Sequence, residues 1–304
     1  MNYTGLPAEK LVARLCPPDK KVRMVLDTDT YNEVDDQFAL AYALKSPERV
    51  GLEAVYAAPF YNDRSNSPED GMEKSYDEII KILNLMGVKP EGFVFKGSAG
   101  YLKNARTPRE SEAAADLVKR AMARDDEPLY VVAIGAITNV ASAILMEPGI
   151  INRIVVIWLG GNALFWKDTR EFNLSQDIHA SRLILDCGVP LVHVPCMGVT
   201  THLTTTVPEL EHYLMGKSAL GTYLVDIVRS YDNNPFGWSK VIWDVAAVAW
   251  LVNEKWLPSG LVSSPVLTDQ FTWSFDPQRH LIRSVFYLHR DEIFADLFKK
   301  LGKD

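Results

Sequence analysis

Four aspartates stand within ten residues in the segment VLDTDTYNEVDDQFAL (25–40): Asp27, Asp29, Asp35 and Asp36. Carboxylates at this density repel one another unless a cation or protons compensate their charge. Oxygen ligands suit hard cations such as Ca²⁺ or Mg²⁺, and a bound cation can lower the pKa of a water molecule and orient it for attack. Capping of a helix N-terminus would account for Asp35 or Asp36, but not for all four acids.

The sequence around these acids alternates between strand-like and helix-like segments. VRMVLD (22–27) is an apolar run with β-branched residues, which is typical of a buried strand. Further strands are expected at 51–57, 93–97, 129–135, 151–161 and 189–195, with strand-like pieces at 271–275 and 282–288. Helices are expected at 35–44, 71–86, 110–123, 139–146, 177–186 and 291–301, and 205–255 is mostly helical apart from a loop at 233–240. Residues 1–20 contain three prolines and are expected to form an irregular lead-in.

This alternation predicts an α/β fold with a mostly parallel central sheet and helices on both faces. The chain shows no repeat, low-complexity segment or clear linker, which favours a single domain over residues 1–304. In such sheets, ligands bind just beyond the carboxyl ends of the strands. Functional residues should therefore follow the expected strands, as the clustered aspartates do.

Charge and composition exclude several classes of protein. The formal net charge is −7, so there is no basic excess to pair with phosphate groups, and nucleic acid is not an expected partner. Three cysteines, at positions 16, 187 and 196, have no CxxC spacing, which argues against disulfides and for a reducing compartment. There is no signal-peptide pattern at the N-terminus and no apolar run of about 18 residues. We expect a cytoplasmic protein without a membrane span.

One alternative starts from the tetrapeptide Asp27-Thr28-Asp29-Thr30. A strand followed by Asp-x-Asp-x-Thr also opens the haloacid-dehalogenase-like phosphatases, in which Asp27 would be the phosphorylated nucleophile and Asp29 the acid/base. That family also has a late acidic pair after another strand. The pair Asp125-Asp126 precedes an expected strand instead of following one, which makes this alternative the weaker one.

Four segments, taken in order, resemble the inosine–uridine-preferring nucleoside hydrolase family. The pairs Asp27/Asp29 and Asp35/Asp36 match the family's opening motif, with the variant turn Asn-Glu-Val before the second pair. The three other matching segments are VVAIGAITNVASAILMEP (131–148), EFN (171–173) and IWDVAAVAWL (242–251). Together the matches span roughly residues 22–251. The resemblance implies hydrolysis of the N-glycosidic bond of a ribonucleoside, a Ca²⁺ cofactor, a role in nucleoside salvage, and a homodimer or homotetramer.

The resemblance also assigns the metal site. Ca²⁺ would be held by Asp29, Asp36, Asp244 and the main-chain carbonyl of Ile134. Asp29 would additionally take the proton from a calcium-bound water that attacks the anomeric carbon. Asp27 would orient these ligands through hydrogen bonds. A structural interpretation of Asp244 alone is that it caps the helix that follows it.

The remaining roles concern the sugar. By resemblance, Asp35 would bind the ribose 2′-hydroxyl, Asn173 the ribose hydroxyls and Glu171 the 5′-hydroxyl. An asparagine usual in the ribose loop is missing where Phe165 stands, and Asn162 is the candidate substitute. Alternatively, Glu171 and Asn173 are plain loop residues.

Position 243 departs from the commonest family pattern. A histidine often precedes the last calcium-binding aspartate and is taken as the general acid, whereas this chain has Trp243. Tryptophan cannot donate a proton usefully, but it can stack on a planar base, which favours a purine nucleoside. Trp243 as a core residue is the structural alternative. Because the histidine that would protonate the leaving base is missing, a second alternative is a non-catalytic relative that binds ribosyl compounds.

Overall fold

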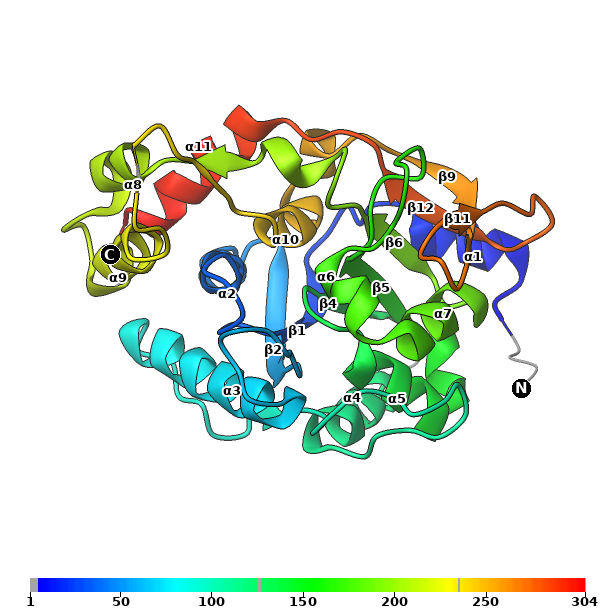
Figure 1. Ribbon diagram of the computed structural model, residues 1–304. Helices are drawn as coiled ribbons and strands as arrows, with labels where there is room; N and C mark the ends of the chain where they lie inside the picture. The colour runs from blue at the N-terminus through cyan, green and yellow to red at the C-terminus, as the bar shows by residue number, and fades with distance from the viewer. Residues whose placement is uncertain (1–4, 125–126, 235, 304) are drawn as a thin grey trace.

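The centre of the fold is a mostly parallel sheet of eight strands, seen in a computed structural model that describes residues 5–124, 127–234 and 236–303 (Figure 1). In spatial order the strands are β3 (Val94–Lys96), β2 (Val50–Ala57), β1 (Val22–Thr28), β4 (Leu129–Ala133), β5 (Ile154–Leu159), β6 (Leu191–Val194), β12 (Leu281–Val285) and β9 (Ser259–Ser263). Every neighbouring pair is parallel except β12 and β9, which are antiparallel. The predicted α/β fold with a mostly parallel sheet is confirmed.

Eleven α-helices occur in the described part of the chain. They are α1 (Ala8–Leu15), α2 (Asp36–Leu44), α3 (Pro68–Leu85), α4 (Glu112–Met122), α5 (Thr138–Met146), α6 (Phe172–Gln176), α7 (Ile178–Asp186), α8 (Val207–Leu214), α9 (Ala219–Arg229), α10 (Val245–Val252) and α11 (Arg290–Leu301). Short 3₁₀ segments lie at Pro148–Asn152, Thr200–His202 and Glu254–Trp256. Two small antiparallel ribbons pair β7 (Thr204–Thr205) with β8 (Lys240–Val241), and β10 (Val266–Leu267) with β11 (Trp273–Ser274).

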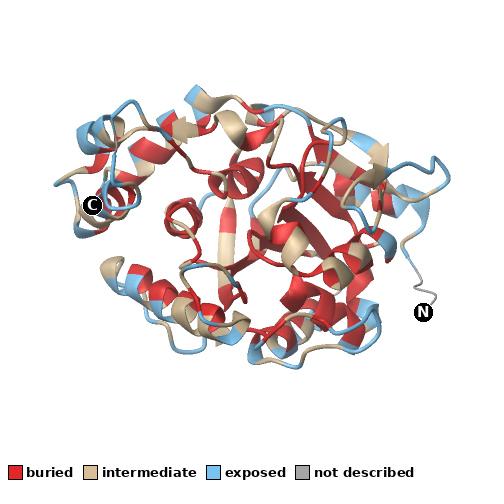
Figure 2. Cartoon of the chain, in the orientation of Figure 1, coloured by how far each residue is buried: buried red, intermediate tan, exposed pale blue. Residues whose placement is uncertain are grey.

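Helices bury both faces of the sheet. Successive side chains of a strand point to opposite faces, so Met24 and Leu26 of β1 join one core and Val25 joins the other. The first core is covered by α2, α3 and α8 to α11, and the second by α4, α5 and α7. All residues of β4 and β5 are buried (Figure 2), which explains why both read as unbroken apolar runs in the sequence.

The parallel strands bring the predicted functional segments to one edge of the sheet. Asp29 follows β1, Ile134 follows β4, Asn162 follows β5 and Cys196 follows β6. These four strands are consecutive neighbours in the sheet. The residues after them therefore form one row at the carboxyl edge, where ligands bind in folds of this kind.

Several boundaries differ from the sequence expectation. The lead-in at 1–20 is not irregular throughout, because α1 forms there and its leucines at 11 and 15 are buried. The expected strand at 151–161 begins later, since the first residues after Pro148 form a 3₁₀ turn. The edge strand β9 and the short helix α6 were not expected at all. Residues 1–4, 125–126 and 235, which belong to expected features, lie outside the described residues.

No helix among the described residues is long and apolar enough to cross a membrane.

Candidate active site

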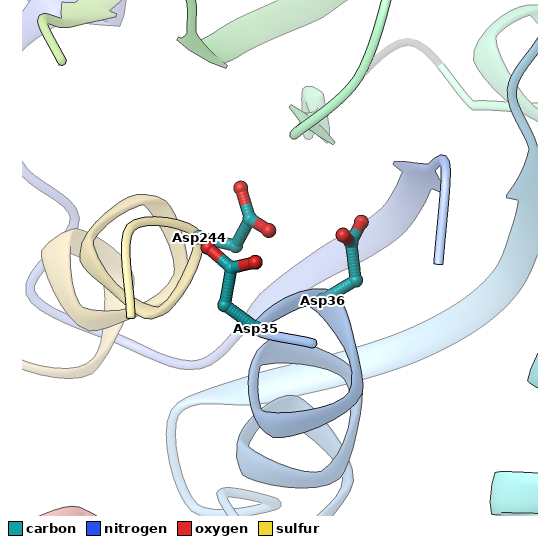
Figure 3. A group of neighbouring side chains, drawn as sticks. All are labelled: Asp35, Asp36 and Asp244. Atoms are coloured by element: carbon teal, nitrogen blue, oxygen red, sulfur yellow. The ribbon is translucent and has the colours of Figure 1, made fainter. Parts of the chain in front are cut away.

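Four buried carboxylates meet at the carboxyl edge of the sheet. Asp29 follows β1, Asp35 and Asp36 open α2, and Asp244 precedes α10, a helix that packs against α2. None of the four is more than 4% exposed. Figure 3 shows the carboxylates of Asp35, Asp36 and Asp244 turned toward a common space. Neither Asp35 nor Asp244 accepts a hydrogen bond from the N-terminal amides of its own helix, so simple capping does not explain them.

The geometry of this cluster fits a hard cation. Oxygen atoms of Asp35, Asp36 and Asp244 all lie within 4.8 Å of one another. Asp29 is not part of that triad, but both of its carboxylate oxygens are buried and accept no hydrogen bond from the described residues. Buried carboxylate oxygens without partners are costly, and a divalent cation bound by oxygen ligands would satisfy them. The donor set therefore suits Ca²⁺ or Mg²⁺.

The pKa values of these acids show the same shortage of positive charge. Burial, followed by the charges of Asp36 and Asp35, raises the pKa of Asp29 well above its usual range. Burial and the same two neighbours act likewise on Asp244. Burial and then Asp35 raise the pKa of Asp36 to about 7. Burial also raises the pKa of Asp35, but only to about 6, because the Lys240 ammonium opposes the shift.

The main-chain carbonyl of Ile134 already has one partner. The side-chain amide of Asn173 donates to it at 3.2 Å and to the carbonyl of Leu159 at 3.0 Å, which ties the ends of β4 and β5 together. A carbonyl oxygen has two lone pairs, so that of Ile134 can still contact a cation. The next residue is Gly135, where an added Cβ would lie 3.0 Å from Cγ of Asp29. A side chain at this position would therefore press on Asp29 unless the turn or Asp29 moved by a few tenths of an ångström.

Asp27 lies behind the cluster and does not line the cavity. It is fully buried, and its Oδ1 accepts a 2.7 Å hydrogen bond from the side-chain amide of Asn139. Its Oδ2 has no partner among the described residues. Asn139 in turn receives hydrogen bonds from the backbone N–H and hydroxyl of Ser98. Asn139 thus fixes the end of β1, and the hydroxyl of Thr138 donates to Asp177 at 2.8 Å.

Glu171 acts as the N-cap of α6. Its Oε1 accepts from the backbone of Asn173 at 2.9 Å, and its Oε2 accepts from Gly161 at 2.7 Å and Leu174 at 3.0 Å. Burial raises the pKa of Glu171, and these backbone hydrogen bonds together with the Cys196 thiol oppose the rise. The carboxylate is therefore held in one orientation by groups on α6 and on the loops after β5 and β6.

A cavity of about 220 Å³ joins these groups. It is lined by every predicted site residue except Asp27, namely Asp29, Asp35, Asp36, Ile134, Asn162, Glu171, Asn173, Trp243 and Asp244. Sequence reasoning missed seven other lining residues: Asn32, Glu33, Leu159, Arg170, Phe172, Cys196 and Met197. The position of Cys196 after β6 was a usable signal, because the topology places it beside the end of β5.

Trp243 and Asn162 occupy different settings. Trp243 is half-buried at the cavity, and its backbone N–H donates to Asp35 at 2.9 Å. Asn162 is buried, and its side chain bridges the carbonyl of Asp168 and the amide of Met197. Asn162 therefore holds the rim loops in place as well as lining the cavity.

Lys240 is a buried cation that the sequence analysis did not identify. Its ammonium pairs with Glu33, and it lies 4.9 Å from the centre of the Tyr231 ring. Burial acts to lower the pKa of Lys240, but the charges of Asp35 and Glu33 outweigh it, so the pKa is raised. The ion pair joins β8, which leads into Trp243 and Asp244, to the turn that leads into Asp35.

Comparison with known proteins identifies the class. Residues 24–280 match the sequence profile of the inosine-uridine preferring nucleoside hydrolases, and the chain belongs to this family. Membership makes it a ribonucleoside N-ribohydrolase, as the resemblance implied. The phosphatase alternative fails on structural grounds too, because Asp27, its required nucleophile, is fully buried and outside the cavity.

Individual relatives are distant. The pyrimidine-specific ribonucleoside hydrolase RihA of Klebsiella pneumoniae (strain 342) is 24% identical over 258 residues, covering 76% of this chain and 80% of RihA. A probable uridine nucleosidase 2 of Oryza sativa subsp. japonica is 23% identical over 240 residues, which cover 72% of this chain and 68% of the nucleosidase. The solved structure of a purine-preferring ribonucleoside hydrolase from Gardnerella vaginalis superposes with a TM-score of 0.76 at 20% identity, covering 92% of this chain and 98% of that one.

Proposed function

We propose that the protein hydrolyses the N-glycosidic bond of a purine ribonucleoside with Ca²⁺ as cofactor, releasing the free base and ribose. One observation carries the proposal: four buried aspartates line one cavity, and neither carboxylate oxygen of Asp29 has a hydrogen-bond partner in the described part of the chain. Such a concentration of negative charge favours the oxocarbenium-like transition state of glycosidic cleavage. It also favours a divalent cation held by oxygen ligands.

Asp29, Asp36, Asp244 and the carbonyl of Ile134 would hold the cation. When bound, Ca²⁺ supplies positive charge that makes a water molecule more acidic and fixes its position. Asp35 also belongs to the closely spaced triad, so its carboxylate completes the negative wall around the same space.

The protein's own groups perform the remaining steps. Asp29 accepts a proton from the attacking water through a carboxylate whose oxygens have no hydrogen-bond partner among the residues that the structure describes. Asp35 accepts a hydrogen bond from the ribose 2′-hydroxyl, while Asn173 and Glu171, which line the same cavity, orient the other sugar hydroxyls. Asp27 positions the end of β1 through its hydrogen bond with Asn139. Asn162 keeps the rim loops in place.

The choice of base rests on Trp243. Its indole lines the cavity and offers a flat surface on which a purine ring can stack. The relatives point in both directions, since RihA is named pyrimidine-specific and the Gardnerella vaginalis enzyme purine-preferring. A comparison of inosine, guanosine, adenosine, uridine and cytidine therefore tests this part of the proposal directly.

The deciding experiment measures release of free base from that panel, with Ca²⁺ and with a chelator, for the wild type and for Asp29→Ala. We expect calcium-dependent release from purine nucleosides, reduced at least about 100-fold in the variant because the proton acceptor is lost. Asp63→Ala, on an exposed loop, is the matched control. Binding of ribose or nucleosides without any turnover would instead identify a non-catalytic ribosyl-binding relative.

Assembly and location follow from the same resemblance. We propose a homodimer or homotetramer in the cytoplasm, acting in nucleoside salvage. The three cysteines are free thiols, which agrees with a reducing compartment. Light scattering of the purified protein measures the assembly, and a monomer at micromolar concentration would contradict it.

A further inference from the structure

A separate cavity, which we call the amino-edge cavity, lies at the edge of the sheet opposite the aspartates. Its volume is about 310 Å³, and its walls come from residues within 13–23 and 127–130. These segments include the end of α1, the loop that follows it, and the starts of β1 and β4 (Figure 1). Because β1 and β4 lead from here to Asp29 and Ile134, a ligand in this cavity would lie at the far end of these strands from the proposed active site.

Four basic residues line the amino-edge cavity, and two of them are already paired with acids. The ammonium of Lys20 lies 2.5 Å from a carboxylate oxygen of Glu127, which lines the same cavity. The guanidinium of Arg23 lies 2.7 Å from a carboxylate oxygen of Glu53. These two pairs account for their own charges and leave the other two basic residues to consider.

The remaining cations, Arg14 and Lys21, have no ion-pair partner among the residues that the structure describes. Both line the amino-edge cavity, with Arg14 half-buried at the end of α1 and Lys21 exposed just before β1. The remaining acid in the walls, Asp19, is exposed, so water and salt screen its charge. In a chain whose net charge is −7, two spare cations in one cavity favour an anionic ligand.

A buried hydroxyl points to the same kind of ligand. Tyr130 lines the amino-edge cavity and is only 5% exposed, and its hydroxyl makes no hydrogen bond within the described part of the chain. Burial raises the pKa of Tyr130 to about 12, although the charge of Arg14 opposes the rise. The hydroxyl therefore keeps its proton at neutral pH and can donate it to an anion. Leaving such a buried donor without an acceptor is costly.

The loop that forms one wall is fixed before any ligand binds. Arg283 of β12 donates from Nε to the carbonyl of Leu15 at 2.5 Å, which holds the end of α1 against the sheet. The guanidinium of Arg49 donates to the carbonyl of Pro18 at 2.8 Å and to that of Asp19 at 3.3 Å. A wall held by two arginines loses little conformational entropy on binding, so the cavity is prepared for a ligand.

We propose that the amino-edge cavity binds the phosphate group of a small phosphate ester. A phosphate monoester carries almost two negative charges at neutral pH, which match the two spare cations. Arg14 can donate two hydrogen bonds to its oxygens, Lys21 supplies a second positive charge, and the Tyr130 hydroxyl donates a further hydrogen bond. The volume lies within the usual range of about 300–1,000 Å³ for ligand pockets, which leaves room for the group that the phosphate carries. The inference does not depend on the proposed function.

Cys16 provides a reporter for this site. It lines the amino-edge cavity and is exposed, whereas Cys187 and Cys196 are buried. The rate at which iodoacetamide, an uncharged reagent, alkylates Cys16 should therefore fall when the cavity is occupied. Mass spectrometry of the full chain follows that rate with inorganic phosphate, with glucose 6-phosphate and with uncharged glucose, and calorimetry gives the Kd of each.

Two variants remove the proposed contacts. Arg14→Gln removes the guanidinium, and Tyr130→Phe removes only a hydroxyl and keeps the packed ring. Arg106→Gln, at an exposed arginine outside the amino-edge cavity, is the matched control for the loss of one positive charge. None of these measurements requires hydrolysis of a nucleoside, so their outcome is independent of whether the proposed function is correct.

We expect both phosphate compounds at saturation to slow alkylation of Cys16 by about tenfold or more, and glucose to leave it unchanged. The Kd for glucose 6-phosphate should rise about tenfold or more in Arg14→Gln and about threefold or more in Tyr130→Phe, because each loses a hydrogen bond to a charged group. Arg106→Gln should bind as the wild type does. Absence of protection by both phosphate compounds, equal protection by glucose, or an unchanged Kd in Arg14→Gln and Tyr130→Phe overturns the inference.

Discussion

The pH dependence of stability provides a sharp test of how Asp27 is buried. Asp27 is fully buried, and burial raises its pKa from 3.8 to about 7 although Asn139 donates to it. The folded protein therefore holds this proton more tightly than the unfolded chain. The corresponding stability is present below pH 3.8 and is lost as the pH rises through about 7. Three pKa units correspond to about 4 kcal/mol of unfolding free energy, of which about 3 kcal/mol is lost between pH 5 and pH 8.

Asp27→Asn removes this titration while keeping the contacts. Its amide oxygen can retain the 2.7 Å hydrogen bond from Asn139, and its amide nitrogen replaces Oδ2 of Asp27, which has no partner in the described ranges of the chain. Urea unfolding of calcium-free protein, followed by tryptophan fluorescence from pH 5 to pH 8, gives the difference between wild type and variant. That difference should shift by about 3 kcal/mol in favour of the variant, because all other acids titrate in both proteins. The exposed substitution Asp63→Asn is the control. A difference that does not change with pH would refute the reasoning.

Three further results are expected. Saturating Ca²⁺, at about 100 times its Kd, should stabilise the wild type by about 3 kcal/mol in thermal unfolding. Asp244→Ala should abolish this stabilisation. If the variant is stabilised as much as the wild type, Asp244 is not a ligand. Gly135→Ala should reduce calcium affinity about tenfold or more in titration calorimetry, because its Cβ would press on Cγ of Asp29 at 3.0 Å; unaltered affinity would show that the turn can yield. Lys240→Met should lower the free energy of unfolding by about 1–3 kcal/mol, measured with urea, because it leaves Glu33 unpaired. Lys240→Arg keeps a positive charge and should retain most of that free energy. Equal losses in both variants would argue against the ion pair.

The layered fold could be predicted because its signals are local. Strands buried on both faces read as apolar runs, and the acids and glycines that follow them mark where each run ends. The expected strand at 22–27 differs from β1 by one residue, and the expected helix at 35–44 differs from α2 by one. The edge strand β9 carried no such signal, since it is half-exposed and only gains its identity by pairing with β12.

The candidate site was predictable only where a residue follows a parallel strand or matches the family motif. Asp29 satisfied both conditions, whereas Asp36 and Asp244 matched the family motif, and the structure places all three around one cavity. Lys240 satisfied neither. It lies in a two-residue strand far along the chain, and its relation to Glu33 depends on how β8 packs against the turn before α2. A lone lysine in a loop-like segment offers no periodicity that would reveal such a contact.

Lys240 also explains how two adjacent acids can take different roles. Asp35 and Asp36 are consecutive and both buried, and burial is the largest cause of the raised pKa of each. They differ in their charged neighbours: the Lys240 ammonium opposes the rise in the pKa of Asp35, whereas the charge of Asp35 adds to the rise in the pKa of Asp36. The Lys240 ammonium favours the ionised form of Asp35, which suits a carboxylate that accepts a hydrogen bond from a substrate hydroxyl. A bound metal ion would offset burial and the charge of Asp35 at Asp36 in the same way. One buried cation thus lets two neighbouring carboxylates differ in function, as the environment does elsewhere for paired carboxylates.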